Sequence, residues 1–307
     1  MSASRDLPPA FRLQAEVENA MLLGEPVVAL ESTVITHGLP YPENLKLARS
    51  MEQEIRQAGA VPATIAIVDG WICLGLEAEK LEFLACTRNL SKISGRDIAP
   101  AVALKRSGGT TVAGTLAIAR TAGLRVFATG GIGGVHRQAP FDISADLMEL
   151  SHSPLVVICA GAKAILDLPR TLEMLETLGV PVAGYQTDEF PAFYSLSSGL
   201  PVSVRVDSPR QAADLAQAHW GMGFISALLL AQPPPSETAL PVETVQAAVD
   251  QALEELQRHQ IHGQAVTPFL LQRVSELTDG SSLQTNLALL RNNARLAAQV
   301  AICLAAK

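Results

Sequence analysis

An isolated lysine, Lys163, follows the apolar run Leu155-Val-Val-Ile-Cys-Ala-Gly-Ala, which has the composition of a buried strand. Because desolvation disfavours the charged form of an amine, a lysine in such surroundings is a candidate nucleophile that forms a Schiff base with a carbonyl carbon. A lysine whose stem packs while its ammonium group reaches water fits the same pattern. Spacing alone leaves both interpretations open.

A carboxylate, Glu31, ends a second apolar run, Val27-Val-Ala-Leu, and is followed by polar side chains at Ser32, Thr33, Thr36 and His37. In a half-buried cleft such a carboxylate can act as an acid or a base. The structural alternative is a strand-end carboxylate that caps backbone amides. Glu31 is therefore a candidate catalytic residue whose role the spacing does not decide.

The segment Phe141-Asp-Ile-Ser-Ala-Asp-Leu147 groups two carboxylates and a hydroxyl ahead of an apolar helical segment. Asp142 is a candidate ligand for Mg²⁺ or Mn²⁺, hard ions that take few carboxylates and several waters. A helix N-cap is the structural alternative for Asp142.

Two glycine-rich stretches and a basic segment could bind a phosphate. Residues 107–114 (SGGTTVAG) and 129–136 (TGGIGGVH) lead into a helix or leave a strand, where backbone amides can approach an anion closely. Neither matches GxGxxG, so a dinucleotide fold is unsupported, and tight turns are the alternative. Lys92, with Arg88 and Arg96, adds positive charge, although a solvated basic face would look the same.

These residues need a scaffold of alternating strands and helices. Short apolar, β-branched runs predict strands, mostly buried on both faces, at residues 27–30, 64–68, 124–128, 155–159, 180–183 and 202–206. Helical apolar spacing predicts helices at residues 43–58, 112–122, 169–178 and 209–220. The alternation favours a largely parallel sheet covered by helices, with the ligand site beyond the carboxyl ends of the strands.

The C-terminal part is expected to be wholly helical. The segment Gln232-Pro-Pro-Pro-Ser236 cannot continue a helix or an interior strand, and we interpret it as a loop within one domain that spans residues 1–307. Helices are predicted at about residues 241–259, 267–277 and 282 to the end. We expect them to cover the sheet or to build an oligomer contact.

Bulk composition limits the function classes. The 307 residues are 48% hydrophobic and 17% charged, as in a globular α/β protein. The net charge of −7 opposes non-specific nucleic-acid binding, so a small anionic ligand would need a local basic pocket. No apolar stretch approaches the ~20 residues that span a bilayer, and no signal-peptide pattern is present, so we expect a cytoplasmic protein without membrane contact. The cysteines lack a CxxC pair and predict reduced thiols, buried at Cys159 and Cys303.

Taken together, these segments resemble the pseudouridine-5'-phosphate glycosidase family, also called the indigoidine synthase A-like family. The resemblance runs in order from about residue 10 to the end of the chain. It rests on the stretches ALESTVITHGLPYPEN, VPATIAIVDGWICLGL, LSKISGRD, TTVAGTLAIARTAG, VFATGGIGGVHR, FDISADLMEL, ICAGAKAILD, VAGYQTDEFPAFY and SLQTNLALLRNNARLAAQVA.

The resemblance implies a three-layer α/β/α sandwich, a homotrimer, and a manganese ion in each subunit. It assigns the proton donor to Glu31, the nucleophile to Lys163 and the metal ligand to Asp142. Substrate contacts fall on Lys92, Val112, Ser144, Ala145 and Asp146, with His136 and Asn286 as further pocket candidates.

The implied reaction is reversible cleavage of the carbon–carbon glycosidic bond of pseudouridine 5'-phosphate to uracil and ribose 5-phosphate, through a ring-opened ribose linked to the lysine. Two other functions fit the residues. A different Schiff-base enzyme for sugar phosphates, such as a deoxyribose-phosphate-type aldolase, would also need a strand-end lysine and a phosphate site. A non-catalytic phosphosugar-binding regulator would bind without turnover.

Overall fold

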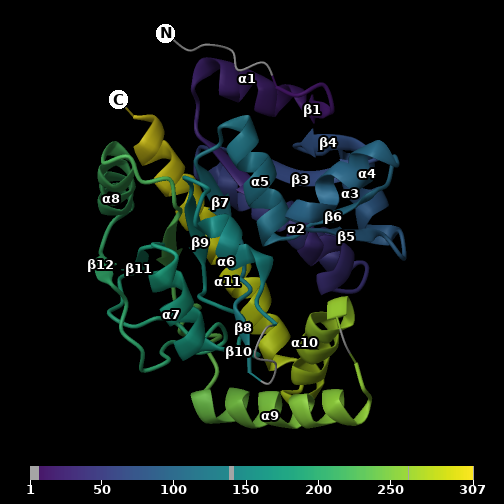
Figure 1. Cartoon of the computed structure of the whole chain (residues 1–307), viewed down its shortest axis with the longest axis vertical. Coiled ribbons are helices and arrows are strands. Elements are labelled where there is room, and N and C mark those ends of the chain that lie inside the picture. The colour runs from purple at the N-terminus through teal and green to yellow at the C-terminus, as the bar shows by residue number, and fades with distance from the viewer. Residues whose placement is uncertain (1–6, 138–141, 262, 307) are drawn as a thin grey trace.

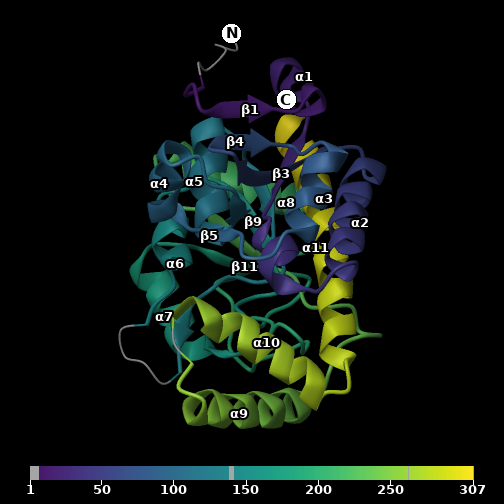
Figure 2. The same ribbon diagram turned by 90° about the vertical axis from the view of Figure 1, so that its right-hand side faces the viewer.

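The computed structural model describes residues 7–137, 142–261 and 263–306. Within these ranges a central sheet lies between two layers of helices, as Figures 1 and 2 show. The predicted three-layer α/β/α sandwich with a mostly parallel sheet is therefore confirmed.

The parallel part of the sheet forms the floor beneath the site. Its spatial order is β2 (Val27–Leu30), β7 (Val126–Ala128), β9 (Val156–Cys159), β13 (Leu228–Ala231), β11 (Val182–Tyr185) and β12 (Val204–Val206). All neighbours in this row run parallel. Every residue of β2 and β9 is buried, as predicted for strands covered on both faces, and so is every residue of β13, which was not predicted.

The other part of the sheet is mixed. Strand β3 (Val61–Val68) runs parallel to β2 but antiparallel to β4 (Trp71–Leu74) and β6 (Gly108–Thr110). Strands β1 (Phe11–Leu13) and β5 (Ser91–Ile93) extend it beside β4 and β6, which makes 11 strands in the described sheet. A separate antiparallel pair joins β8 (Val135–His136) to β10 (Leu166–Asp167).

Several of these strands were missed from the sequence. Strands of two or three residues show no periodicity, and the glycines of β6 have low strand propensity. Strand β13 is a short apolar run, and such a run cannot be distinguished from a buried helix segment by pattern alone. The predicted strands and helices were otherwise found, with ends shifted by a few residues.

Helices form the two outer layers. One face carries α2 (Glu43–Gln57), α3 (Ala78–Cys86), α8 (Pro209–Gly221) and α11 (Ser281–Ala305). The other carries α4 (Ile98–Ala103), α5 (Val112–Ala122), α6 (Ala145–Leu150) and α7 (Leu168–Thr177). Helix α1 (Ala15–Leu23) lies at the same end of the molecule as the last turns of α11, and α9 (Val242–Arg258) and α10 (Val266–Leu277) lie together at the opposite end (Figure 1). Short helical turns occur at Val34–Gly38, Gly95–Asp97 and Gly263–Ala265.

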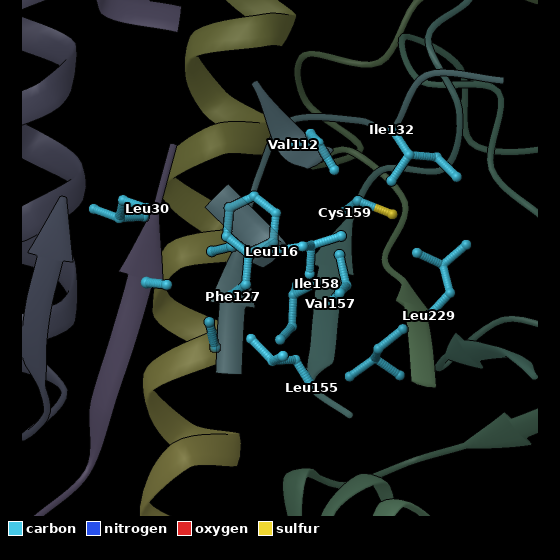
Figure 3. Packing of buried hydrophobic residues seen from close by; sticks show 14 of the residues in the cluster. Leu30, Val112, Leu116, Phe127, Ile132, Leu155, Val157, Ile158, Cys159 and Leu229 are labelled. Atoms are coloured by element: carbon cyan, nitrogen blue, oxygen red, sulfur yellow. The ribbon is translucent and has the colours of Figure 1, made fainter. Parts of the chain in front are cut away.

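The main core is aliphatic and lies on both faces of the parallel strands. Figure 3 shows part of it, with Phe127 from β7, Val157 and Ile158 from β9, and Leu229 from β13. The long helix α11 packs against β7, β9 and β2 through its buried face. This helix confirms that part of the helical C-terminal region covers the sheet.

The cysteines are free thiols in the structure. Cys159 is buried as predicted, but the prediction of a buried thiol at Cys303 is wrong, because this residue lies near the end of α11 and is half-exposed. No helix within the described ranges is long and apolar enough to cross a membrane.

Candidate active site

A cavity of about 600 Å³ lies where β2, β7 and β9 end, beyond their carboxyl termini. The segments that follow these strands contribute Glu31, Thr129 and Lys163, and α11 reaches the cavity from the C-terminal region with Asn286. All the site residues expected from the sequence line this cavity: Glu31, Lys92, Val112, His136, Asp142, Ser144, Ala145, Asp146, Lys163 and Asn286. The structure therefore brings the separate motifs to one place.

Glu31 follows β2 directly and is almost completely buried. Burial raises the pKa of its carboxyl group above the usual range, while Lys163, the hydroxyl of Thr129 and Lys92 oppose this shift. The Thr129 hydroxyl donates a hydrogen bond to Glu31 Oε1, and no backbone amide of the described residues donates to the Glu31 carboxyl group. The alternative of an amide-capping carboxylate therefore does not describe Glu31, and a raised pKa suits a proton donor.

Lys163 lies on the loop after β9 with a half-buried side chain. Its neighbours Ala160, Ala162 and Ala164 are buried and small, which leaves space next to the amine. The loop turns at Gly161, whose φ of +85° and whose approach to the carbonyl of Pro191 exclude a side chain, since a Cβ would lie 2.4 Å from that oxygen. The backbone amide of Lys163 donates to Ile132 at 3.1 Å, so the lysine is tied to the loop after β7.

Asp146, in the first turn of α6, lines the cavity and accepts two backbone hydrogen bonds. The amide of Ala113, in the first turn of α5, donates to Oδ1 and the amide of Gly133 donates to Oδ2, both at 2.8 Å. A Cβ on Gly133 would lie 2.2 Å from Ser144 Oγ, so the glycine permits this close packing. These two amides of the glycine-rich stretches are thus engaged by a carboxylate and are not free for a phosphate.

Lys92, on β5, lines the cavity and supplies positive charge to it. Burial and the nearby charge of Lys163 lower the pKa of its ammonium group, and Asp146 and Glu31 raise it. Arg96 also lines the cavity, whereas Arg88 is exposed and is not among the lining residues. Of the three basic residues, Lys92 and Arg96 therefore line the cavity and Arg88 does not.

Asp142 is exposed at the cavity wall, and its backbone carbonyl accepts a hydrogen bond from the amide of His136 at 3.0 Å. Burial lowers the pKa of His136, and the charge of Asp142 raises it. The N-cap of α6 is Ser144, whose hydroxyl accepts from the Asp146 amide at 3.2 Å, so the N-cap alternative for Asp142 is wrong. Phe141, which begins the predicted segment, lies outside the described residues.

The donor set around Asp142 is sparse. Across residues 7–137, 142–261 and 263–306, no group of three or more His, Cys, Asp or Glu side chains could hold a metal ion. A single exposed carboxylate fits an ion of the Mg²⁺ or Mn²⁺ type that keeps most of its water ligands. One carboxylate does not fit a site in which protein ligands enclose the metal ion.

Three residues in and around the cavity were not found from the sequence as functional: Thr129, which lines it, and Arg137 and Asn293, which bond segments that line it. Thr129 bonds Glu31, Arg137 bonds the backbone around Lys163, and Asn293 bonds the Thr129 carbonyl. The Asn286 Oδ1 atom is buried without a hydrogen-bond partner in the described part of the chain, and it can accept a donor from a ligand. Asn286 was expected in the pocket from the family resemblance. Local pattern gives no signal for the roles of Thr129, Arg137 and Asn293, because each depends on contacts between distant segments.

Nearly the whole chain resembles known proteins. Residues 16–303 match the family model for indigoidine synthase A like protein. A pseudouridine-5'-phosphate glycosidase of Herpetosiphon aurantiacus is 55% identical over 294 residues, which are 95% of this chain and 97% of that protein. One of Solibacter usitatus is 52% identical over 293 residues, covering 95% and 98%.

Solved structures agree with the fold. The prealnumycin C-glycosynthase AlnA, in complex with ribulose 5-phosphate, has a TM-score of 0.90 at 39% identity and covers 97% of this chain and 98% of its own. An indigoidine synthase A-like protein of Thermotoga maritima has a TM-score of 0.89 at 36% identity and covers 96% of each chain. The chain therefore belongs to the indigoidine synthase A-like family, the family of its relatives named pseudouridine-5'-phosphate glycosidase.

Proposed function

We propose that this protein is a pseudouridine-5'-phosphate glycosidase, which reversibly cleaves the C1'–C5 bond of pseudouridine 5'-phosphate to uracil and ribose 5-phosphate. The observation that supports this most is the shared cavity of Glu31, Lys163 and Lys92, an acid of raised pKa beside two lysines. The names of the relatives and the sugar phosphate bound to the C-glycosynthase agree with it.

Ring opening is the first step. The C5 carbon of uracil is a poor leaving group, so direct departure should be slow. In this proposal Glu31 protonates the ribose ring oxygen, and the C1'–O bond breaks with electrons supplied by the uracil ring. C1' becomes electrophilic and conjugated to the base. The buried carboxyl group retains its proton to higher pH than an exposed one, which favours this role.

Lys163 completes the cleavage. Its neutral amine adds to C1' and gives up a proton, and C5 of uracil is protonated. The C1'–C5 bond then breaks, its electrons restore the uracil double bond, and the lysine nitrogen forms an iminium with C1'. Water adds to C1' and releases open-chain ribose 5-phosphate, returning one proton to the amine and one to Glu31.

We also propose that Asp142 binds Mn²⁺ through its exposed carboxylate. Bound there, the ion would supply positive charge for the anionic substrate. His136 lies next to Asp142, and its lowered pKa keeps the imidazole neutral near neutral pH, so it adds no charge beside the ion. Lys92, Val112, the Ser144–Asp146 segment and Asn286 would contact the substrate directly.

The wider properties of the family remain proposals for this chain. We propose that residues 1–307 form one domain, that the protein assembles as a homotrimer in the cytoplasm, and that it contacts neither membrane nor nucleic acid. Sedimentation equilibrium would test the trimer, because a monomer mass at micromolar protein would contradict it.

The experiment that tests the function is incubation of the purified protein with pseudouridine 5'-phosphate and Mn²⁺, followed by chromatography for uracil. We expect uracil and ribose 5-phosphate in equal amounts. A deoxyribose-phosphate-type aldolase would release no uracil from this compound. A phosphosugar-binding regulator would bind it without turnover, with no loss of affinity specific to Glu31 variants. Absence of uracil under all metal conditions would contradict the proposal.

A further inference from the structure

Thr129 is a fully buried residue with one described partner for its hydroxyl. The residue follows β7, has 0% exposure and donates from Oγ1 to Oε1 of Glu31. Among the described residues this is the hydrogen bond that the Thr129 hydroxyl makes. A buried hydroxyl without an acceptor costs about 1–3 kcal/mol, so Thr129 is the donor and Oε1 the acceptor.

The backbone of Thr129 is fixed on two sides. Its amide donates to the carbonyl of Ile158 in β9 at 3.0 Å. Its carbonyl accepts from Nδ2 of Asn293 at 2.9 Å. Asn293 is 1% exposed and lies on the buried face of α11 with Leu289 and Leu296, so it is a polar residue in an apolar stripe. The C-terminal helix thereby holds the threonine that contacts Glu31.

A carboxylic acid carries its proton on one oxygen, and the other oxygen is the better acceptor. We propose that Thr129 is a positioning residue that occupies Oε1 of Glu31 and so keeps the transferable proton on Oε2, where it faces the substrate, with Asn293 holding Thr129 in place. Oε2 has no hydrogen bond to a described residue, and Glu31 lines the cavity. The inference rests on the proposed role of Glu31 as the proton donor.

The charged groups that face Glu31 are Lys163, Asp146 and Lys92. They belong to the loop after β9, to α6 and to β5, so none of them lies on the segment that carries Thr129. Burial raises the pKa of Glu31, whereas the Thr129 hydrogen bond stabilises the ionised form and lowers it. Loss of the hydroxyl must therefore raise the pKa of Glu31. A packing defect without loss of this hydrogen bond predicts no particular direction for the pKa shift.

The test compares variants that differ in the hydroxyl. Thr129→Val removes the donor at similar size, and Thr129→Ser retains it. Thr129→Cys, with a weaker S–H donor, provides the test if the valine variant does not fold. Thr121→Val is the matched control, because the Thr121 hydroxyl bonds only within α5, to Ala117 at 2.8 Å, on the exposed side.

The first readout is the pH profile of uracil release. For Thr129→Val we expect kcat to fall by roughly tenfold, which is a small part of the ~10²–10⁴-fold that a positioned acid contributes. We also expect the alkaline limb of the profile, where activity falls as Glu31 loses its proton, to move to higher pH. Thr129→Ser should restore the wild-type limb, Thr129→Cys should lie between, and Thr121→Val should match wild type. An alkaline limb that stays in place or moves to lower pH in Thr129→Val overturns the inference.

The second readout does not depend on turnover. Infrared difference spectra of the full-length protein follow the protonated carboxyl band of Glu31, identified by its loss in Glu31→Gln. We expect this band to persist to higher pH in Thr129→Val than in wild type, even if no uracil is formed. A wild-type protein that releases no uracil contradicts the proposed function, whereas an unshifted band contradicts the role of Thr129.

Discussion

Nη2 of Arg137 lies 3.0 Å from the carbonyl oxygen of Ala164, the residue directly after Lys163. Nε of the same guanidinium lies 3.1 Å from the carbonyl oxygen of Leu166. Nη1 lies 3.4 Å from Asp250 of α9. One side chain thus fixes the backbone that presents the lysine amine and joins it to a helix of the C-terminal region.

Replacing Arg137 with Met should slow formation of the lysine adduct. The change leaves two carbonyls without their donor, at a cost of about 1–3 kcal/mol each where they stay buried. We expect kcat to fall by roughly tenfold with a smaller change in KM, because displacement of a reacting group by about 1 Å is costly. Rapid-quench measurement of the borohydride-trapped adduct checks this.

Asp250→Asn is the control for Arg137. It removes only the ion pair to α9, in which the Asp250 side chain is 57% exposed, and such a pair contributes ~0–1 kcal/mol. This variant should behave like wild type. Equal effects of the two changes would show that the link to α9 matters, and not the carbonyl contacts.

Glu31→Gln should stabilise the fold as pH rises. The folded pKa of Glu31 lies above its unfolded value, so the stability associated with its proton is complete below the unfolded pKa and is lost as pH rises through the folded pKa. Gln cannot ionise and avoids this loss. At pH values above the folded pKa of Glu31, we expect the variant to melt at a higher temperature than wild type. Below the unfolded pKa, we expect the difference in melting temperature to vanish. Calorimetry between acid and neutral pH measures it, and a constant difference would contradict the buried acid.

The phosphate should be needed for efficient turnover. Lys92 offers a half-buried cation in the cavity, and remote binding energy can position the reacting centre. We expect unphosphorylated pseudouridine to be a far poorer substrate, and Lys92→Met to reduce kcat/KM for the nucleotide by roughly 10- to 100-fold, more than for the nucleoside. Lys80→Met, a change of an exposed lysine on α3, is the control. Equal kcat/KM for nucleoside and nucleotide would refute the phosphate contact.

Chelation should suppress turnover, and Mn²⁺ should restore it best. Asp142→Ala should lose both activity and bound Mn²⁺, because the carboxylate is the proposed ligand. Electron paramagnetic resonance of titrated Mn²⁺ measures binding independently of activity, and Asp214→Ala on α8 is the exposed control. Undiminished turnover after removal of metal would rule out the dependence.

Buried strands rich in β-branched residues, and the residues that flank them, were predictable from the sequence. Residues 27–30 were predicted as a strand with the same ends as β2 because paired valines favour a strand, whereas the leucines of β13, a run of the same length, do not. Helices α5 and α8 begin at the predicted residues because Thr111 and Ser208 cap them through their side chains. Glu31 and Lys163 were found because strand ends meet at one edge of a parallel sheet.

Contacts between distant segments could not be read from the pattern. The Asp146 carboxylate binds amides of the two glycine-rich stretches that looked available to a phosphate, and only the fold brings the three segments together. Thr129 and Asn293 are 164 positions apart, and each alone is an ordinary buried polar residue. Arg137 could not be identified from the pattern either, because it reaches the Leu166 carbonyl only where β8 pairs with β10.

Trapping of the covalent intermediate tests the account most directly. Borohydride added during turnover of pseudouridine 5'-phosphate should reduce the iminium and fix a ribose-phosphate adduct, which peptide mapping should place on Lys163. Lys163→Ala should abolish the adduct and turnover. Lys163→Arg should fail equally, because a guanidinium stays protonated and cannot form the iminium. An adduct mapped to Lys92, or substantial turnover by Lys163→Arg, would contradict Lys163 as the nucleophile.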